Sequence, residues 1–135
     1  MIRQLDERTF VSGQIAPHEV AGLAKQGVTV LVNNRPDGED ADQPLASAIE
    51  EAAAAAGIAY RFVPIIRGIG PADVDAMQEA LREAAGGKLL AFCRSGSRSA
   101  LVCALAHREA GASSEEVQQR LMATGFDPAP IAHLL

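Results

Sequence analysis

One short segment of the chain combines the residue types that chemistry on an anion requires: Cys93-Arg94-Ser95-Gly96-Ser97-Arg98. It lies between two apolar stretches, residues 89–92 and 100–106, where polar side chains have no packing purpose. A thiol next to guanidinium groups is a typical arrangement for a nucleophile that attacks an anionic substrate. We therefore predict that the segment is an anion-binding loop and that Cys93 is the nucleophile.

The neighbouring elements would hold this loop at one end of a sheet. A buried strand is expected over residues 88–92, and a helix is expected to start at Ser97 or Arg98. Ligands of open α/β sheets bind at the carboxyl ends of strands, where unpaired N–H groups and the helix dipole attract anions. Gly96 would supply a positive φ or a close backbone approach. The predicted substrate-binding residues of the loop and helix start are Arg94, Ser95, Gly96, Ser97 and Ser99.

The two catalytic roles are predicted for Cys93 and Arg98. The planar guanidinium of Arg98 can place two parallel hydrogen bonds on one bound oxyanion, which a lysine cannot do. The positive surroundings should favour the thiolate of Cys93, although a lone cysteine at a strand end is more often a small buried hydrophobe. Cys103 lies in an apolar stretch and is predicted to be a packing residue.

Alternating apolar runs and chain breakers predict an α/β fold over the whole chain. Strands are expected over residues 10–13, 28–32, within 58–66 and over 88–92, with residues 2–5 paired to the first of them. Helices are expected over residues 17–26, 45–56, 72–85, 97–110, 113–123 and 128–135. We predict one domain, residues 1–135, with a central, mostly parallel sheet of about four or five strands flanked by helices.

The composition limits the partners and the compartment. The chain has 135 residues, a net charge of −5 and no block of Lys or Arg, which argues against nucleic acid or an anionic membrane as the partner. The sequence contains neither a secretory signal nor an apolar run long enough to span a bilayer, so a cytoplasmic protein with reduced thiols is expected. The three histidines, His18, His107 and His133, lack metal-ligand spacing, and no metal or cofactor is predicted.

A long polar loop, residues 33–44, follows the buried strand over residues 28–32 and would lie on the same rim of the sheet as Cys93. Within it, Arg35 is predicted to bind the substrate. Asp37 or Asp40 could act as a general acid in this position. The alternative is a solvated loop that is held by turn chemistry at Asp37-Gly38.

Three separated motifs resemble one known family. They are Phe-Val-Ser-Gly-Gln at residues 10–14, Val-Leu-Val-Asn-Asn-Arg-Pro-Asp-Gly-Glu at residues 30–39 and the loop at residues 93–99. In this order they resemble the phosphatase-like domain of beta-lactamase hydrolase-like proteins. The resemblance implies a dual-specificity tyrosine-phosphatase-like fold, and family members are described as phosphatases and as sulfurtransferases.

Two departures from the phosphatase pattern affect the expected reaction. Four residues separate Cys93 from Arg98, where the phosphatase pattern has five, and Phe92 replaces a histidine. The shorter loop resembles that of rhodaneses, which carry a persulfide. In addition, no acid occurs between residue 63 and Asp73, where phosphatases keep a proton donor. Such a donor accelerates phosphomonoester hydrolysis by about 10²–10⁴-fold, whereas sulfite leaves thiosulfate without one.

We therefore predict a sulfurtransferase in which Cys93 takes a sulfur from thiosulfate or a small persulfide and becomes a persulfide. A thiol such as glutathione would accept the sulfur. The alternative is a phosphatase that acts through a cysteinyl-phosphate on phosphomonoesters such as phosphotyrosine. A third interpretation, from another class, is a catalytically idle module that binds anions or senses redox state.

Overall fold

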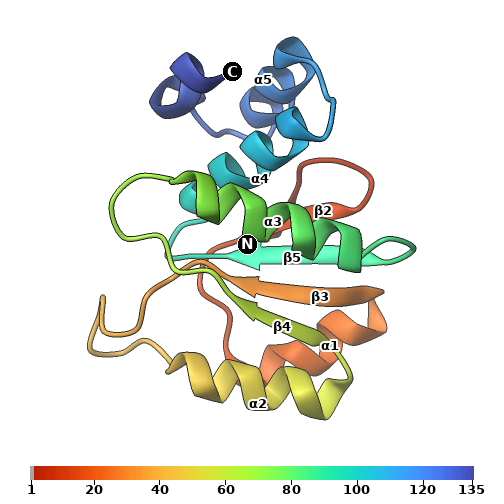
Figure 1. Ribbon diagram of the computed structural model, residues 1–135. Coiled ribbons are helices and arrows are strands. Elements are labelled where there is room, and N and C mark those ends of the chain that lie inside the picture. The colour runs from red at the N-terminus through yellow and green to blue at the C-terminus, as the bar shows by residue number, and fades with distance from the viewer. Residues whose placement is uncertain (1) are drawn as a thin grey trace.

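In the computed structural model, five strands form one sheet in the order β1-β2-β5-β3-β4 (Figure 1). The structure describes residues 2–135. The strands are β1 (Ile2–Gln4), β2 (Thr9–Ser12), β3 (Val28–Asn33), β4 (Ala59–Phe62) and β5 (Lys88–Phe92). All neighbours are parallel except β1, which pairs antiparallel with β2. The predicted α/β architecture with a mostly parallel sheet is confirmed, including the pairing of the first two strands.

Helices cover both faces of this sheet (Figure 1). They are α1 (Val20–Lys25), α2 (Ala46–Ala56), α3 (Pro71–Glu83), α4 (Ser97–Glu109) and α5 (Ser114–Ala123), with the 3-10 helices η1 (Pro17–Glu19) and η2 (Ala129–Leu134). The pair α1 and α2 lies on one face and the pair α3 and α4 on the other, while α5 and η2 pack outside α4. No helix in the described part of the chain is long and apolar enough to cross a membrane.

The central strands are apolar on both sides because each face of the sheet packs against helices. In β5, Leu89 and Ala91 belong to the core under α3 and α4, whereas Leu90 and Phe92 belong to the core under α1 and α2. Successive side chains of a strand point to opposite faces, so a continuous apolar run satisfies both cores. These two cores fix the position at which β5 ends and the chemistry-bearing loop begins.

Two of the predicted helices contain 3-10 turns. One starts as a 3-10 helix before it continues as an α-helix, and the other is a 3-10 helix along its whole length. The helix predicted from residue 17 begins as η1 before α1 continues it, and the last predicted helix is η2 throughout. Proline lacks the N–H that an α-helix needs in its interior, and Pro130 lies inside η2. The prolines therefore favour short, tighter turns at both places.

The end of β2 supports the loop that follows β5. The N–H of Cys93 donates to the carbonyl oxygen of Ser12 at 3.2 Å, and the N–H of Gln14 donates to that of Arg94 at 3.4 Å. Between them, Gly13 is packed so tightly that a Cβ there would lie 2.9 Å from the Arg94 carbonyl oxygen. Glycine at this position allows the two backbones to approach closely.

We predict that Gly13→Ala destabilises the protein by about 1–3 kcal/mol, because the added methyl group must displace a backbone carbonyl of the loop. The matched control is Gly22→Ala in α1, where no heavy atom lies within 4 Å of the added Cβ. This control should gain about 0.5–1 kcal/mol from helix propensity. Urea denaturation measures both free energies of unfolding. Equal stability of the two variants would contradict the close approach at Gly13.

Candidate active site

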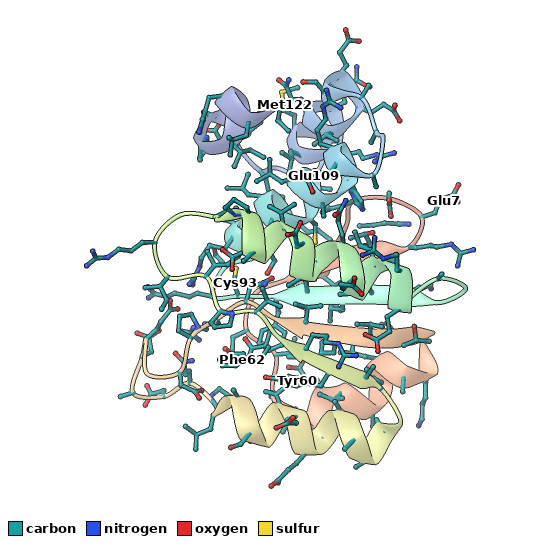
Figure 2. All side chains as sticks on the ribbon, viewed as in Figure 1. Glu7, Tyr60, Phe62, Cys93, Glu109 and Met122 are labelled. Carbon is teal, nitrogen blue, oxygen red and sulfur yellow. The ribbon has the colours of Figure 1, made fainter. Side chains whose placement is uncertain are left out.

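Cys93 lies directly after β5, at the end of the sheet to which the parallel strands point (Figure 2). Its side chain forms the floor of the loop, with 1% of the residue exposed. The N–H of Gly96 donates to Sγ at 3.1 Å. This N–H belongs to the residue that precedes α4, so the helix N-terminus also faces the sulfur. Both features place hydrogen-bond donors around the sulfur, where an anionic substrate would bind.

Gly96 gives the loop its turn. Its φ of +97° is in the left-handed region, which side chains rarely adopt, and α4 starts at the next residue. The neighbouring hydroxyls of Ser95 and Ser97 are exposed and lie 3.2 Å apart, at the mouth of the loop. The structure therefore brings the predicted loop residues together around Cys93.

Arg98 extends from the first turn of α4 and is held at one end of its guanidinium. Nη1 and Nη2 donate to the two carboxylate oxygens of Glu39 at 2.6 and 2.9 Å. Nη1 also donates to the carbonyl oxygen of Ile65 at 2.8 Å. The other edge of the guanidinium carries Nε–H and the second hydrogen of Nη2. Within residues 2–135, no carboxylate or carbonyl oxygen accepts a hydrogen bond from this edge. A guanidinium presents two forks, and this edge is the one left for an oxyanion.

Glu39 and Arg98 stabilise each other's charge. The hydrogen bonds from Arg98, followed by those from Arg35 and opposed by burial, lower the pKa of Glu39 to about 2. The hydrogen bond to Glu39 raises the pKa of Arg98. Burial of the guanidinium acts in the opposite direction, and the nearby Cys93 raises this pKa further. Glu39 therefore remains an ionised clamp on Arg98 and does not serve as a proton donor near neutral pH.

Arg35 lies in the loop between β3 and α2, paired with Glu39 and Asp40 of the same loop. Only 4% of it is exposed, and all three of its nitrogens are bonded within the protein. Nε donates to Glu39 at 3.0 Å, Nη1 to Gln14 at 3.0 Å and Nη2 to Asp40 at 2.7 Å. Its guanidinium therefore braces the loop that carries Glu39, and substrate binding by Arg35 stays a prediction.

The two acids considered as proton donors also have structural partners. Asp37 accepts the N–H of Ala46, the first residue of α2, at 2.7 Å. Asp40 pairs with Arg35 and lies 3.5 Å from Nε of Arg94. Asp37 therefore satisfies the first backbone N–H of α2, a structural contact that differs from the predicted turn at Asp37-Gly38. Asp40 is half-exposed, and its contact with Arg94 holds it next to the loop that follows β5.

Ser99 lies in the first turn of α4 and is fully buried. Its hydroxyl donates to Oδ1 of Asn34 at 2.8 Å, and its role in substrate binding stays a prediction. The side-chain Nδ2 of Asn34 donates to the carbonyl oxygen of Val63 at 2.9 Å. The backbone carbonyl oxygen of Asn34 accepts the N–H of Ile65 at 3.0 Å. Asn34 therefore ties the start of α4 to the segment whose Ile65 carbonyl contacts Arg98.

Sequence reasoning missed the roles of Glu39 and Asn34. Glu39 was one of several acids in a polar loop, and Asn34 one of two adjacent asparagines. The available signal was their position in the loop after a buried strand, at the end of the sheet where Cys93 lies. Cys103, by contrast, lies in the core as predicted, and burial raises the pKa of its thiol well above the ordinary range.

Comparisons with known proteins show the family and the fold of the chain. Residues 1–112 match the model of the beta-lactamase hydrolase-like protein, phosphatase-like domain. The chain belongs to this family. A beta-lactamase hydrolase-like protein of Xylella fastidiosa (strain Temecula1) is 38% identical over 128 residues, which cover 93% of this chain and 30% of that protein. The phosphatase-like domain described here thus spans about a third of the length of that relative.

Two solved structures show the fold. A candidate phosphatase from Neisseria meningitidis is 27% identical, with a TM-score of 0.75 over 97% of this chain and 93% of that one. Human DUSP28 is 25% identical, with a TM-score of 0.69 over 96% of this chain and 85% of that one. The predicted family and the tyrosine-phosphatase-like fold are confirmed, and a phosphatase-like cysteine enzyme is supported. These relatives give no support to sulfur transfer or to a thiol acceptor, and they favour the phosphatase alternative.

We predict that Cys93 reacts faster with the anion iodoacetate, relative to neutral iodoacetamide, than a free thiol does. The ratio of the two rates should exceed that of glutathione by about tenfold or more, because the loop concentrates anions next to the thiolate. Intact mass after alkylation should show one adduct in the wild type and in Cys103→Ala, and none in Cys93→Ser. A ratio equal to that of glutathione would contradict an anion-binding loop.

The pH dependence of stability tests the clamp on Arg98. Because the folded-state pKa of Glu39 is lowered to about 2, its stabilising effect is complete above the ordinary pKa of about 4.3 and is lost as the pH falls towards 2. Glu39→Gln should therefore cost about 1–2 kcal/mol at pH 7 and much less at pH 2.5. Asp42→Asn, at an exposed acid of the same loop, is the control for urea denaturation at both pH values. A cost of Glu39→Gln that does not change with pH would contradict the ion pair.

Proposed function

We propose that this domain hydrolyses phosphomonoesters through a cysteinyl-phosphate on Cys93. The observation that carries the proposal is the arrangement of three groups around one point. The sulfur accepts the N–H of Gly96, and Arg98 stands beside it with its Nη ends held by Glu39. A tetrahedral dianion placed over the sulfur would meet N–H groups of the loop and the unused edge of Arg98.

The reaction would proceed in two displacement steps. In the first, the thiolate of Cys93 attacks phosphorus, an S–P bond forms, and the P–O bond to the leaving group breaks with its electron pair on oxygen. In the second, water attacks the same phosphorus, the S–P bond breaks, the thiolate returns, and inorganic phosphate leaves. Arg98 and the loop N–H groups would stabilise the charge on the three outer oxygens in both steps.

The carboxyl groups around the site favour substrates with good leaving groups. Glu39 has a pKa of about 2, Asp37 caps α2, and Asp73 accepts the N–H of Gly70 at 2.9 Å. None of these three is arranged as a proton donor, and Asp40 is held by Arg35. We therefore expect aryl and acyl phosphates, which leave without protonation, to react far faster than alkyl phosphates.

Sulfur transfer is the second candidate, and one observation favours it. Only four residues separate Cys93 from Arg98, so the loop has fewer N–H groups for a phosphoryl group than the phosphatase pattern supplies. A persulfide needs less room than a phosphoryl group. Both reactions would start from the same thiolate, and the mass of the covalent intermediate distinguishes them.

The test measures turnover and intermediate on one preparation. The wild type should hydrolyse p-nitrophenyl phosphate and, when quenched in acid during turnover, should carry one phosphoryl group on Cys93 by intact mass. Arg98→Lys should lose roughly 10²-fold or more in kcat/KM, because lysine cannot form the fork, whereas Arg67→Lys on the exposed loop should stay near wild type. A persulfide formed from thiosulfate, without phosphate release from any aryl phosphate, would replace this proposal by sulfur transfer.

A further inference from the structure

The aromatic ring of Phe126 packs against the glycine at which the anion-binding loop turns. A Cβ at Gly96 would lie 3.4 Å from Cζ and 3.6 Å from Cε1 of this ring, and 3.5 Å from the backbone of Ser12. Gly96 is therefore enclosed between the end of β2 and the ring. Phe126 itself is buried and belongs to the core under α3 and α4. A core residue thus touches the turn whose N–H donates to the thiol of Cys93.

The end of α5 explains why Phe126 points inward. Gly125, two residues beyond this helix, has a φ of +86°. The N–H of Phe126 donates to the carbonyl oxygen of Leu121 at 2.9 Å. The N–H of Gly125 donates to that of Met122 at 3.1 Å. These two bonds form a Schellman motif, in which the residue after the glycine folds back on the helix, so the local sequence directs the apolar Phe126 towards the core.

Arg3, an exposed residue of β1, holds the same segment in place. Its guanidinium carbon lies 5.1 Å from the centre of the Phe126 ring, within the range of a cation–π interaction. Its Nη1 also donates to the carbonyl oxygen of Thr124 at 2.6 Å. Residues 124–126 are therefore attached both to the edge strand β1 and to the loop that follows β5.

The contact with the ring matters because a glycine does not hold a turn by itself. Glycine adopts positive and negative φ about equally readily, so its neighbours must select one conformation. At Gly96 the selected φ of +97° accompanies the hydrogen bond from its N–H to Sγ of Cys93. Without the ring, the space next to Gly96 would admit other loop conformations that do not present this N–H. Anion affinity falls in proportion to the fraction of molecules that keep the competent conformation.

We infer that Phe126 is a positioning residue of the anion-binding loop. It acts through Gly96, by keeping the N–H groups of the loop directed at the sulfur and at a bound anion. The family model matches residues 1–112, so this inference extends the candidate active site to the part of the chain that follows the matched region. It rests on the anion binding of the proposed function, and it applies to phosphoryl and sulfur transfer alike, because both reactions start in the same loop.

The first experiment measures alkylation of Cys93 in Phe126→Ala and in the matched control Ile131→Ala. Ile131 is 3% exposed and lies in η2 within the same core, so its truncation also weakens the packing of the C-terminal segment. Both variants should unfold at lower urea concentrations than the wild type. For the folded proteins, the ratio of the iodoacetate rate to the iodoacetamide rate should fall about 3–10-fold in Phe126→Ala, and should stay within about twofold of the wild type in Ile131→Ala.

A conservative variant and turnover separate positioning from a general loss of stability. Phe126→Leu keeps an apolar side chain at this position, and its rate ratio should lie closer to the wild type than to Phe126→Ala. With p-nitrophenyl phosphate, Phe126→Ala should lose about 3–10-fold in kcat/KM, whereas Ile131→Ala should stay within about twofold. A wild-type rate ratio in Phe126→Ala, or equal losses in the two alanine variants, would overturn the inference.

Amide hydrogen exchange tests the same contact without any reaction. In Phe126→Ala, the N–H of Gly96 should exchange at least about tenfold faster than in the wild type. The reference is the N–H of Leu89 in β5, which donates to the carbonyl oxygen of Arg8 at 2.8 Å. Unchanged exchange at Gly96 relative to Leu89 would remove the positioning role and leave the proposed function standing. Faster exchange, in a protein that hydrolyses no aryl phosphate, would remove the proposed function and keep the positioning role.

Discussion

The forked ion pair between Glu39 and Arg98 is the interaction on which the candidate site depends. It joins the loop after β3 to the first turn of α4, two segments between which the chain forms α2, β4, α3 and β5. Buried Arg35 holds the same carboxylate and anchors it to Gln14 beyond β2. Strong, geometrically specific bonds of this kind hold a guanidinium in one orientation, with one of its two edges directed to the anion.

This arrangement resolves a conflict between the charge of the protein and the charge of its ligand. With a net charge of −5, the protein as a whole repels anions. The acids nearest the loop are paired with arginines, Glu39 with Arg98 and Asp40 with Arg35, so their negative charge is largely compensated at the mouth. What remains near the thiol is the N-terminal end of α4 and the part of the Arg98 guanidinium that Glu39 does not bind. Anion capture is therefore local, and it relies on oriented N–H groups rather than on the overall field.

Much of the fold and the core of the site could be predicted from sequence, because both depend on local patterns. The apolar runs at residues 28–32 and 88–92 identify strands, and the strand-to-helix turn between residues 93 and 98 places the backbone of Cys93 and Arg98 locally. The orientation of the Arg98 side chain, in contrast, depends on the distant Glu39. The partners of Arg35 and Ser99 could not be predicted in this way. Whether Arg35 faces substrate or braces Glu39 depends on how two remote loops meet, and no spacing along the chain encodes that meeting. The expected reaction was inferred from the loop length and the missing proton donor, and the relatives favour the phosphatase alternative.

The most direct test of the central claim is a crystal structure of the protein with bound tungstate, an unreactive tetrahedral oxyanion. We predict that the anion lies over Sγ of Cys93, within hydrogen-bond distance of the Gly96 loop and of Nε and Nη2 of Arg98. Glu39 should keep both of its bonds to the Nη end of the same guanidinium. An anion bound only at another surface, or one that displaces Glu39 from Arg98, would contradict this account of the site.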